Sequence, residues 1–173
     1  MIICTILAFL IIIIFSIFWT VPYGAGWVPT PMRAVYNMLA IAEVKPTDVV
    51  YDLGSGDGRI VVVAAKEFGA KVVGIEIDPL RFIFSWVRIK LTGLDSKVEL
   101  IWGDFFKLDI SEASVVTLFL SQEANDRLKK KFEEELKPET RIVSFHWIFN
   151  EWESVKNSED GEIHLYRINK LRR

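Results

Sequence analysis

The feature that most constrains the fold is a glycine-rich stretch at residues 52–58, Asp-Leu-Gly-Ser-Gly-Asp-Gly. An apolar run at residues 49–51 precedes it, and a largely apolar segment at residues 60–68 follows it. Because glycine adopts positive φ angles without strain, this order predicts a buried strand, a tight turn and then a helix. In open α/β sheets, ligands bind at such turns, at the carboxyl ends of the strands.

The rest of the chain continues this alternation of strand and helix patterns. One helix is expected to begin with Thr30 as N-cap and Pro31 as first helical residue, and another to run from Pro79 to about Leu91. The other expected elements are a helix at 122–136 and strands at 71–77, 97–102, 113–120, 141–145, 152–155 and 162–168. This alternation predicts an α/β fold with a Rossmann-like, seven-stranded, mostly parallel sheet and helices on both faces. The last two expected strands lie too close together in the sequence for a crossover helix between them. They should therefore form a hairpin, which puts one antiparallel strand into the sheet.

The N-terminus differs in composition from everything that follows. Residues 1–20 carry no charged side chain, and residues 2–19 are almost wholly apolar. About 20 such residues at 1.5 Å rise match a hydrocarbon core of roughly 30 Å. Trp19, Tyr23 and Trp27 cluster where the chain would leave a bilayer, as in an aromatic belt. This pattern predicts one transmembrane helix.

Two alternatives to this anchor are a cleaved signal peptide and a buried core helix. A signal peptide would need a basic n-region, which is absent, and residues 24–26 make only a weak cleavage site. A core helix would need a partner surface, although the remaining chain already accounts for a domain. We therefore expect a transmembrane anchor at residues 1–21, a linker at 22–29 and a folded domain at 30–173. The first charges, Arg33 and Lys45, follow the anchor, which predicts a single-pass membrane protein with its domain in the cytoplasm.

Charge and composition exclude several classes of partner. The 21 Lys and Arg residues against 23 Asp and Glu give a net charge of −2, so no nucleic-acid partner is expected. Cys4 is the single cysteine, which rules out an internal disulfide. The two histidines, His146 and His164, have no Cys or His at ligand spacing, so we expect no metal.

Two phosphate-binding motifs compete for the loop at residues 52–58. A dinucleotide fingerprint needs its third glycine one position after Gly58, where Arg59 stands. A Walker loop needs a Gly-Lys-Ser/Thr sequence, which is missing. The carboxylate of Asp52 would also repel a pyrophosphate but would attract an ammonium group. The loop therefore favours a ligand without phosphate.

Acidic residues follow three successive strands, each at its carboxyl end. Asp52 precedes the glycine turn, Glu76 ends the next strand in position to accept ribose hydroxyls, and Asp104 follows the third in position to accept from an adenine amino group. Phe105 could stack beside the adenine ring, while Asp78 is interpreted as the cap of the helix at Pro79. A ligand with an amine, a ribose and an adenine but no phosphate is S-adenosylmethionine.

Residues 30–170 resemble class I methyltransferases that use this cofactor. More narrowly, the chain looks like archaeal protein-lysine methyltransferases and their mitochondrial relatives that methylate inner-membrane proteins. The resemblance is carried by residues 27–31 (WVPTP), 50–60 (VYDLGSGDGRI), 111–117 (SEASVVT) and 135–141 (ELKPETR). Two positions depart from the family: Trp27 replaces the usual Tyr, and Phe145-His146 replace the usual His and acid after Ser144.

The resemblance implies a set of site residues. It places the segment 29–31 over the cofactor, and it places the segment from Phe119 to Asn125 beside the target side chain. The expected cofactor-binding residues are Thr30, Asp52, Gly54, Ser55, Gly56, Glu76, Asp104 and Phe105. The expected substrate-binding residues are Phe119, Asn125 and Trp147.

Methyl transfer from a sulfonium mainly requires alignment with a neutral amine, so no dedicated base or catalytic residue is assigned. Aromatic walls would lower the pKa of an incoming lysine by desolvation. The first functional hypothesis is a protein-lysine N-methyltransferase acting on membrane or membrane-adjacent proteins. The alternatives are a methyltransferase for a lipid or quinone and a non-catalytic, cofactor-binding membrane module.

Overall fold

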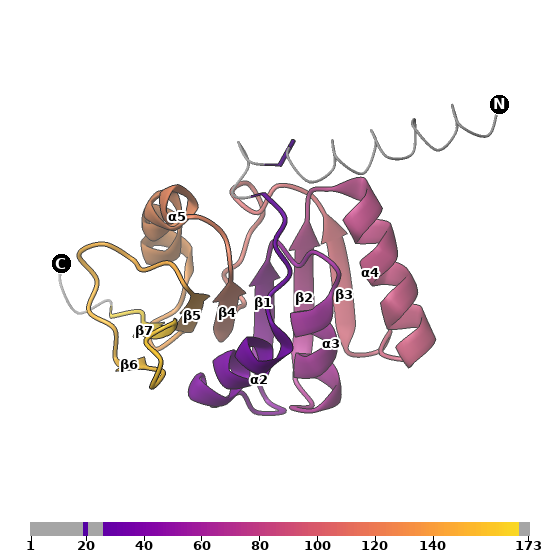
Figure 1. Cartoon of the computed structure of the whole chain (residues 1–173), viewed down its shortest axis with the longest axis horizontal. Coiled ribbons are helices and arrows are strands. Elements are labelled where there is room, and N and C mark those ends of the chain that lie inside the picture. Colours follow the sequence, from indigo (N-terminus) through magenta and orange to yellow (C-terminus); the bar gives the residue numbers. More distant parts are fainter. Residues whose placement is uncertain (1–18, 21–25, 170–173) are drawn as a thin grey trace.

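Seven strands form one sheet in the order β3-β2-β1-β4-β5-β7-β6 (Figure 1). The computed structural model describes residues 19–20 and 26–169. The strands are β1 (Val49–Leu53), β2 (Lys71–Glu76), β3 (Val98–Trp102), β4 (Val115–Leu118), β5 (Arg141–Phe145), β6 (Lys156–Asn157) and β7 (Ile163–Arg167). The helices are α2 (Met32–Ile41), α3 (Arg59–Lys66), α4 (Pro79–Thr92) and α5 (Gln122–Glu135). The predicted Rossmann-like sheet is confirmed.

The direction of the strands follows from the lengths of their connections. The strands β1 to β5 pair in parallel, because each connection is long enough to cross over the sheet. Strand β7 is antiparallel to both of its neighbours, β5 and β6. The expectation of one antiparallel strand near the end of the chain is confirmed.

Apolar side chains cover both faces of the sheet. Alternate residues of a strand point to opposite faces, so Val50 and Tyr51 enter different clusters. The cluster of Val50 includes residues of α2 and α3, and the cluster of Tyr51 includes Leu128 and Phe132 of α5. In Figure 1, α2, α3 and α4 cross one face of the sheet while α5 lies beside β4 and β5. Helices therefore hold the carboxyl ends of the strands in place from both sides.

Two local boundaries differ from the expectation. The N-cap of α2 is Pro31 rather than Thr30, and the helix begins at Met32. Pro31 has an extended ψ of 138°, while the Thr30 carbonyl accepts a bond from Arg59, so the chain turns into the helix one residue later. The strand expected at 152–155 forms at Lys156–Asn157, where the backbone meets β7.

The expected anchor at 1–21 lies outside the described residues, except for Trp19 and Thr20, and most of the linker at 22–29 does too. Within the described ranges, no helix is both long and apolar enough to cross a bilayer.

Candidate cofactor site

The glycine turn after β1 exposes its backbone at the carboxyl edge of the sheet. Gly54, Gly56 and Gly58 all have positive φ angles, of 78°, 56° and 76°. The amides of Gly54 and Ser55 both donate to the Ile75 carbonyl, each at 2.9 Å, which fixes the turn against β2. A side chain at Gly58 would overlap the Ser85 hydroxyl of α4, so the turn also sets how closely α3 and α4 approach. The local sequence thus folds as the glycine pattern predicts.

Asp52 is a buried acid of the site with a strongly raised pKa. Its side chain is buried at the end of β1, and its Oδ1 accepts a hydrogen bond of 2.8 Å from the Thr117 hydroxyl. Burial, with the nearby negative charge of Glu76, raises the pKa of Asp52 to about 7, although the Thr117 bond opposes the rise. Among the described residues, no cation pairs with this carboxylate. A buried acid in this state favours a cationic ligand.

Glu76 lies at the end of β2 and ties the glycine turn to the start of α4. Its Oε2 accepts from the Gly56 amide at 2.7 Å, and its Oε1 accepts from the Asp78 amide at 2.8 Å. Arg81 lies 3.7 Å from the same carboxylate. Burial still raises the pKa of Glu76, because desolvation outweighs these favourable contacts. Both carboxylate oxygens are therefore held rigidly at the edge where the ligand is expected.

The start of the domain covers the glycine turn. Arg59 pairs with Asp57 through two hydrogen bonds, of 2.9 and 2.7 Å, and its third nitrogen donates to the Thr30 carbonyl at 2.8 Å. This bridge holds the segment 29–31 against the loop. Trp27 packs so close to Gly56 that a Cβ there would lie 3.2 Å from the indole nitrogen.

A cavity opens between this covering segment and the strand ends. Seven of the eight expected cofactor residues line it, all except Asp104. The Ser55 hydroxyl is buried there without a hydrogen-bond partner in the described part of the chain. The other lining residues that matter for the site are Trp27, Arg59, Ile77, Arg81, Phe119 and Leu120.

Asp104 lies two residues after β3, at the same edge of the sheet, but its carboxylate has a local role. It accepts from the Phe106 amide at 3.0 Å and lies 3.6 Å from the Lys107 ammonium. Phe105, in contrast, is buried and faces the cavity. The proposed contact of Asp104 with an adenine stays a prediction.

The expected substrate residues divide into two groups. Phe119 lines the cavity and makes an edge contact with Phe145, with ring centroids 4.8 Å apart. Asn125 and Trp147 are not among the described lining residues. The buried Asn125 amide donates to the Ser144 hydroxyl and to the Trp147 carbonyl, both at 3.1 Å, so it fixes the backbone after β5.

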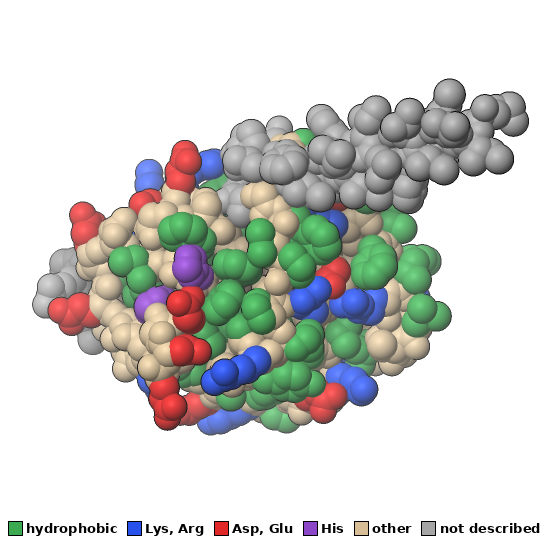
Figure 2. Space-filling view, viewed as in Figure 1, with side chains coloured by type: hydrophobic (Ala, Val, Ile, Leu, Met, Phe, Trp, Pro, Cys, Tyr) green, Lys and Arg blue, Asp and Glu red, His purple; other side chains and the backbone are tan. Residues whose placement is uncertain are grey.

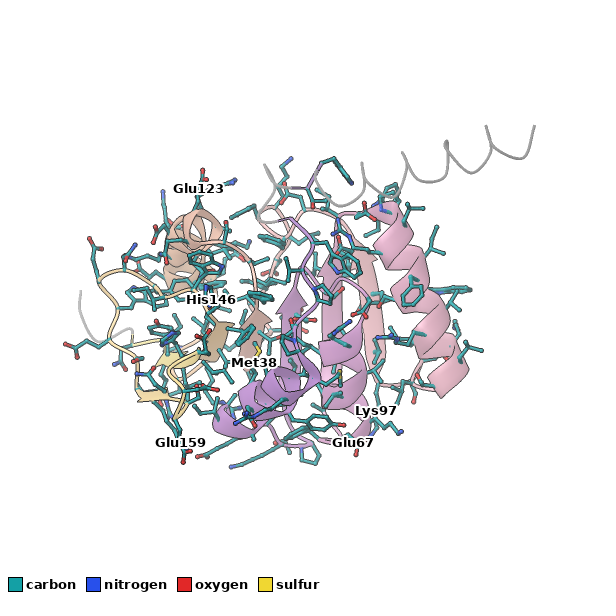
Figure 3. All side chains as sticks on the ribbon, viewed as in Figure 1. Met38, Glu67, Lys97, Glu123, His146 and Glu159 are labelled. Carbon is teal, nitrogen blue, oxygen red and sulfur yellow. The ribbon has the colours of Figure 1, made fainter. Side chains whose placement is uncertain are left out.

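His146, which departs from the family pattern, still lies beside an acid. Its Nδ1 lies 2.8 Å from the Glu162 carboxylate, and both side chains are about half exposed. The residue adopts a φ of 70°, a left-handed conformation that is uncommon outside glycine. Figure 3 shows His146 on the β5 side of the molecule, away from α4.

Sequence reasoning missed three positions that the tertiary structure brings to the site. Thr117 is the single polar residue of the strand Val115–Leu118, and this polarity was the sequence signal that could have indicated its contact with Asp52. Arg59 was noted only as a departure from the dinucleotide fingerprint. Trp19, interpreted only as part of an aromatic belt, donates through its indole nitrogen to the Asp78 carboxylate at 2.6 Å. The interpretation of Asp78 as a helix cap is confirmed, since its Oδ1 accepts from the Arg81 amide.

The residues present fit S-adenosylmethionine. The buried Asp52 carboxylate, which no described cation neutralises, suits its ammonium group, the rigid Glu76 carboxylate suits its ribose, and Phe105 offers an apolar wall. The fold and this site define an S-adenosylmethionine-dependent methyltransferase. Residues 52–156 match the family described as the ANTKMT methyltransferase domain, and the chain belongs to this family.

Known proteins support this membership. A protein-lysine N-methyltransferase of Saccharolobus islandicus is 45% identical over 155 residues, which cover 86% of this chain and 94% of that protein. The adenine nucleotide translocase lysine N-methyltransferase of Mus musculus is 31% identical over 142 residues, covering 82% of this chain but only 59% of that protein. The crystal structure of an RNA methyltransferase from Salinibacter ruber with S-adenosyl-L-homocysteine superposes with a TM-score of 0.81 and 43% identity, covering 83% of this chain and 95% of that one.

Proposed function

We propose that this methyltransferase is held at a membrane by its N-terminal segment and methylates lysine side chains of membrane or membrane-adjacent proteins. The observation that carries the cofactor chemistry is the buried Asp52 carboxylate, without a cation among the described residues, in a cavity beside the glycine turn. Support for a lysine acceptor comes from the relatives, of which the archaeal one extends over nearly the same length as this chain.

The cavity wall supports an amine acceptor. S-adenosylmethionine, when bound, would supply a methyl group on a sulfonium; transfer to the acceptor would break the carbon–sulfur bond, form a carbon–nitrogen bond and leave a neutral thioether. The amine must arrive without its proton, which passes to water. Phe105 and Phe119 line the cavity, and Phe145 extends the aromatic surface beyond Phe119. An apolar wall of this kind desolvates a lysine ammonium and so lowers its pKa.

The connection between the apolar N-terminus and the site supports a membrane-adjacent acceptor. Residues 2–18 are almost wholly apolar, and Trp19, which follows them, donates a hydrogen bond to Asp78, whose amide in turn donates to Glu76. If the apolar segment enters a bilayer, only a few residues separate it from the cavity, so the cavity lies close to the bilayer surface. Acceptors would then have to lie at or near that surface.

The decisive experiment is labelling of the host's own membranes with S-adenosylmethionine that carries a radioactive methyl group. The full chain should place label in membrane protein, and amino-acid analysis should recover it as methyl-lysine. Asp52→Asn should lose this labelling, while Asp109→Asn, which changes an exposed carboxylate, should retain it. Label in the organic extract would favour a lipid or quinone acceptor instead, and cofactor binding without any transfer would favour a non-catalytic module.

RNA is the acceptor named for the Salinibacter ruber structure, so total RNA belongs in the same assay. We expect no label there, because the net charge of −2 offers no electrostatic attraction to a phosphate backbone. Incorporation of the methyl label into RNA at a level similar to that in membrane protein would overturn the lysine proposal.

We also propose that the domain faces the cytoplasm, since Arg33 and Lys45 are the first charges after the apolar segment. Protease added to inside-out vesicles should degrade the domain, and protease added to right-side-out vesicles should spare it. The reverse pattern would contradict this orientation.

A further inference from the structure

Most of the large apolar side chains of helix α4 point outward, while the polar Arg81 and Ser85 lie on its buried side together with Ile89. Ile83 and Phe84 are each 56% exposed, and Leu91 is 83% exposed. On the opposite side, Arg81 is 9% exposed and Ser85 is fully buried. An ordinary surface helix packs its apolar side on the core, whereas Ile89 is the only apolar residue of α4 that is buried there.

The exposed side chains form a continuous surface. Their spacing repeats at three and four residues, which places them on one face about 100° wide. In Figure 2, hydrophobic side chains gather on the side of the molecule where α4 lies. The α4 apolar face consists of Leu80, Ile83, Phe84, Val87 and Leu91.

The cofactor site accounts for the polar inner side of the helix. Arg81 lies close to both Glu76 and Asp78, and its NH2 donates to the Thr20 hydroxyl at 3.2 Å. Ser85 must stay small because Gly58 passes directly beside it. Arg81 and Ser85 are therefore buried because they pack against the cofactor site. No contact within the described residues covers the α4 apolar face.

Two basic residues border this face, and each also pairs with an acid: Arg88 with Asp57 at 3.2 Å and Lys90 with Asp95. Lys90 lies 5.7 Å from the Trp86 ring centroid on one border, and Arg88 lies 5.3 Å from the Phe84 ring centroid on the other. The helix contains no Asp or Glu between Pro79 and Thr92. An apolar stripe with long basic side chains at its edges is typical of helices that lie in the interface of a bilayer.

Two tryptophans lie at the N-terminal end of this helix. Trp19 donates to the Asp78 carboxylate, and the 64%-exposed Trp102 donates to the Ile77 carbonyl at 2.9 Å. The residue that directly follows the apolar segment 2–18 therefore contacts the cap of α4. The part of the chain expected to enter a membrane thus meets the domain where the α4 apolar face begins.

We infer that the α4 apolar face lies in the interfacial layer of a lipid bilayer, so that the domain has two membrane contacts rather than one flexible tether. This inference rests on the proposed membrane anchoring. Contact along α4 would hold the strand ends at a constant height above the bilayer, because Glu76 and Asp78 join the cofactor site directly to the start of this helix. Acceptor lysines would then have to lie within that height.

The test uses the full chain in vesicles of phosphatidylcholine and phosphatidylglycerol, with an environment-sensitive fluorophore on single cysteines. The native Cys4 reports on the apolar segment. In a Cys4→Ser background, Val87→Cys reports on the α4 apolar face, and Glu159→Cys is the control at an exposed site far from α4 (Figure 3). Cofactor binding by each labelled variant establishes that it is folded.

We expect the probe at position 87 to lose about half of its emission to lipids brominated in the upper acyl chain, since interfacial helices lie roughly 5–10 Å into this layer. The probe at position 159 should keep its emission. Quenching at position 4 without quenching at position 87 would overturn the inference and leave the anchor intact. Quenching at none of the three positions would reject the anchor as well.

A blue-shifted probe at position 87 that brominated lipid does not quench would also overturn the inference. That result would mean that protein covers the face, either a second copy or residues 1–18 of the same chain. Dilution of the vesicles with lipid separates these two cases, because only contact between copies weakens on dilution. The methyl-transfer assay is independent of every one of these outcomes.

Discussion

The Thr117 hydroxyl donates a hydrogen bond of 2.8 Å to the Asp52 carboxylate, between residues that are direct partners in the register of β1 and β4. This bond lowers the pKa of the buried acid, whereas desolvation and the neighbouring carboxylates raise it. The state of charge of the cofactor site therefore depends on a hydroxyl from a neighbouring strand.

Cofactor affinity should rise with pH as Asp52 ionises. The pKa of this acid is about 7, so calorimetric titration of S-adenosylmethionine should show tighter binding at pH 7.5 than at pH 6. Asp52→Asn should bind weakly at both values and lose this dependence. Equal affinity of the wild type at the two pH values would contradict a role for the ionised acid.

The same acid should destabilise the cofactor-free protein at neutral pH. Its pKa is raised from 3.8 to about 7 on folding, so the folded state holds a proton that the unfolded state has released, and stability falls as pH rises through this window. Asp52→Asn should remove this fall and stabilise the protein at pH 8 by roughly 1–3 kcal/mol. Thermal unfolding from pH 5 to pH 8 measures the effect, and a variant less stable than wild type at pH 8 would contradict it.

Thr117→Val should raise the pKa of Asp52 further, because it removes the hydroxyl without changing the shape of the side chain. The pH at which cofactor affinity reaches half its maximum should move upward. Thr117→Ser, which keeps the hydroxyl, serves as the matched control. A Val variant with an unchanged midpoint would show that the bond does not tune the acid.

Gly58→Ala should destabilise the fold by about 1–3 kcal/mol, since the residue has a φ of 76° and its new methyl would overlap Ser85. Adding Ser85→Ala should recover part of the loss by removing the overlapping oxygen. Denaturant unfolding of the single and double variants gives the comparison. Full recovery would mean that backbone strain contributes nothing.

Arg59→Ala should weaken cofactor binding by opening the covering segment. The side chain joins Asp57 to the Thr30 carbonyl, and its loss removes the side-chain hydrogen bond that ties the segment 29–31 to the glycine turn. Dissociation of the cofactor, followed by stopped-flow fluorescence, should become faster. Arg33→Ala, at an exposed position on α2, should leave the rate unchanged; equal effects of the two variants would argue against a specific bridge.

Much of the fold was predictable because its signals are local. Alternating strand and helix patterns predicted the order of elements, and the short chain near the C-terminus predicted an antiparallel strand. Boundaries were less predictable: the strand expected at 113–120 is limited to Val115–Leu118, where it can pair with β1 and β5. The residues at which a strand begins and ends depend on the neighbouring strands as well as on its own sequence.

The sequence alone determined where the cofactor site must lie, since a glycine turn after a buried strand and acids after successive strands are set by neighbours in the chain. Only the tertiary structure decided how the site is completed. It joins Thr117 to Asp52 and Arg59 to Thr30, residues 65 and 29 positions apart.

The tertiary structure also decided which side of α4 is buried. The sequence of this helix supplies an apolar stripe that a core would ordinarily bury. Glu76 at the end of β2 and Asp78 at the cap of α4 instead draw Arg81 to the buried side, and the close approach of Gly58 places Ser85 there. Which side of a helix is buried depends on strand register and on packing between distant segments, and no local sequence pattern encodes either.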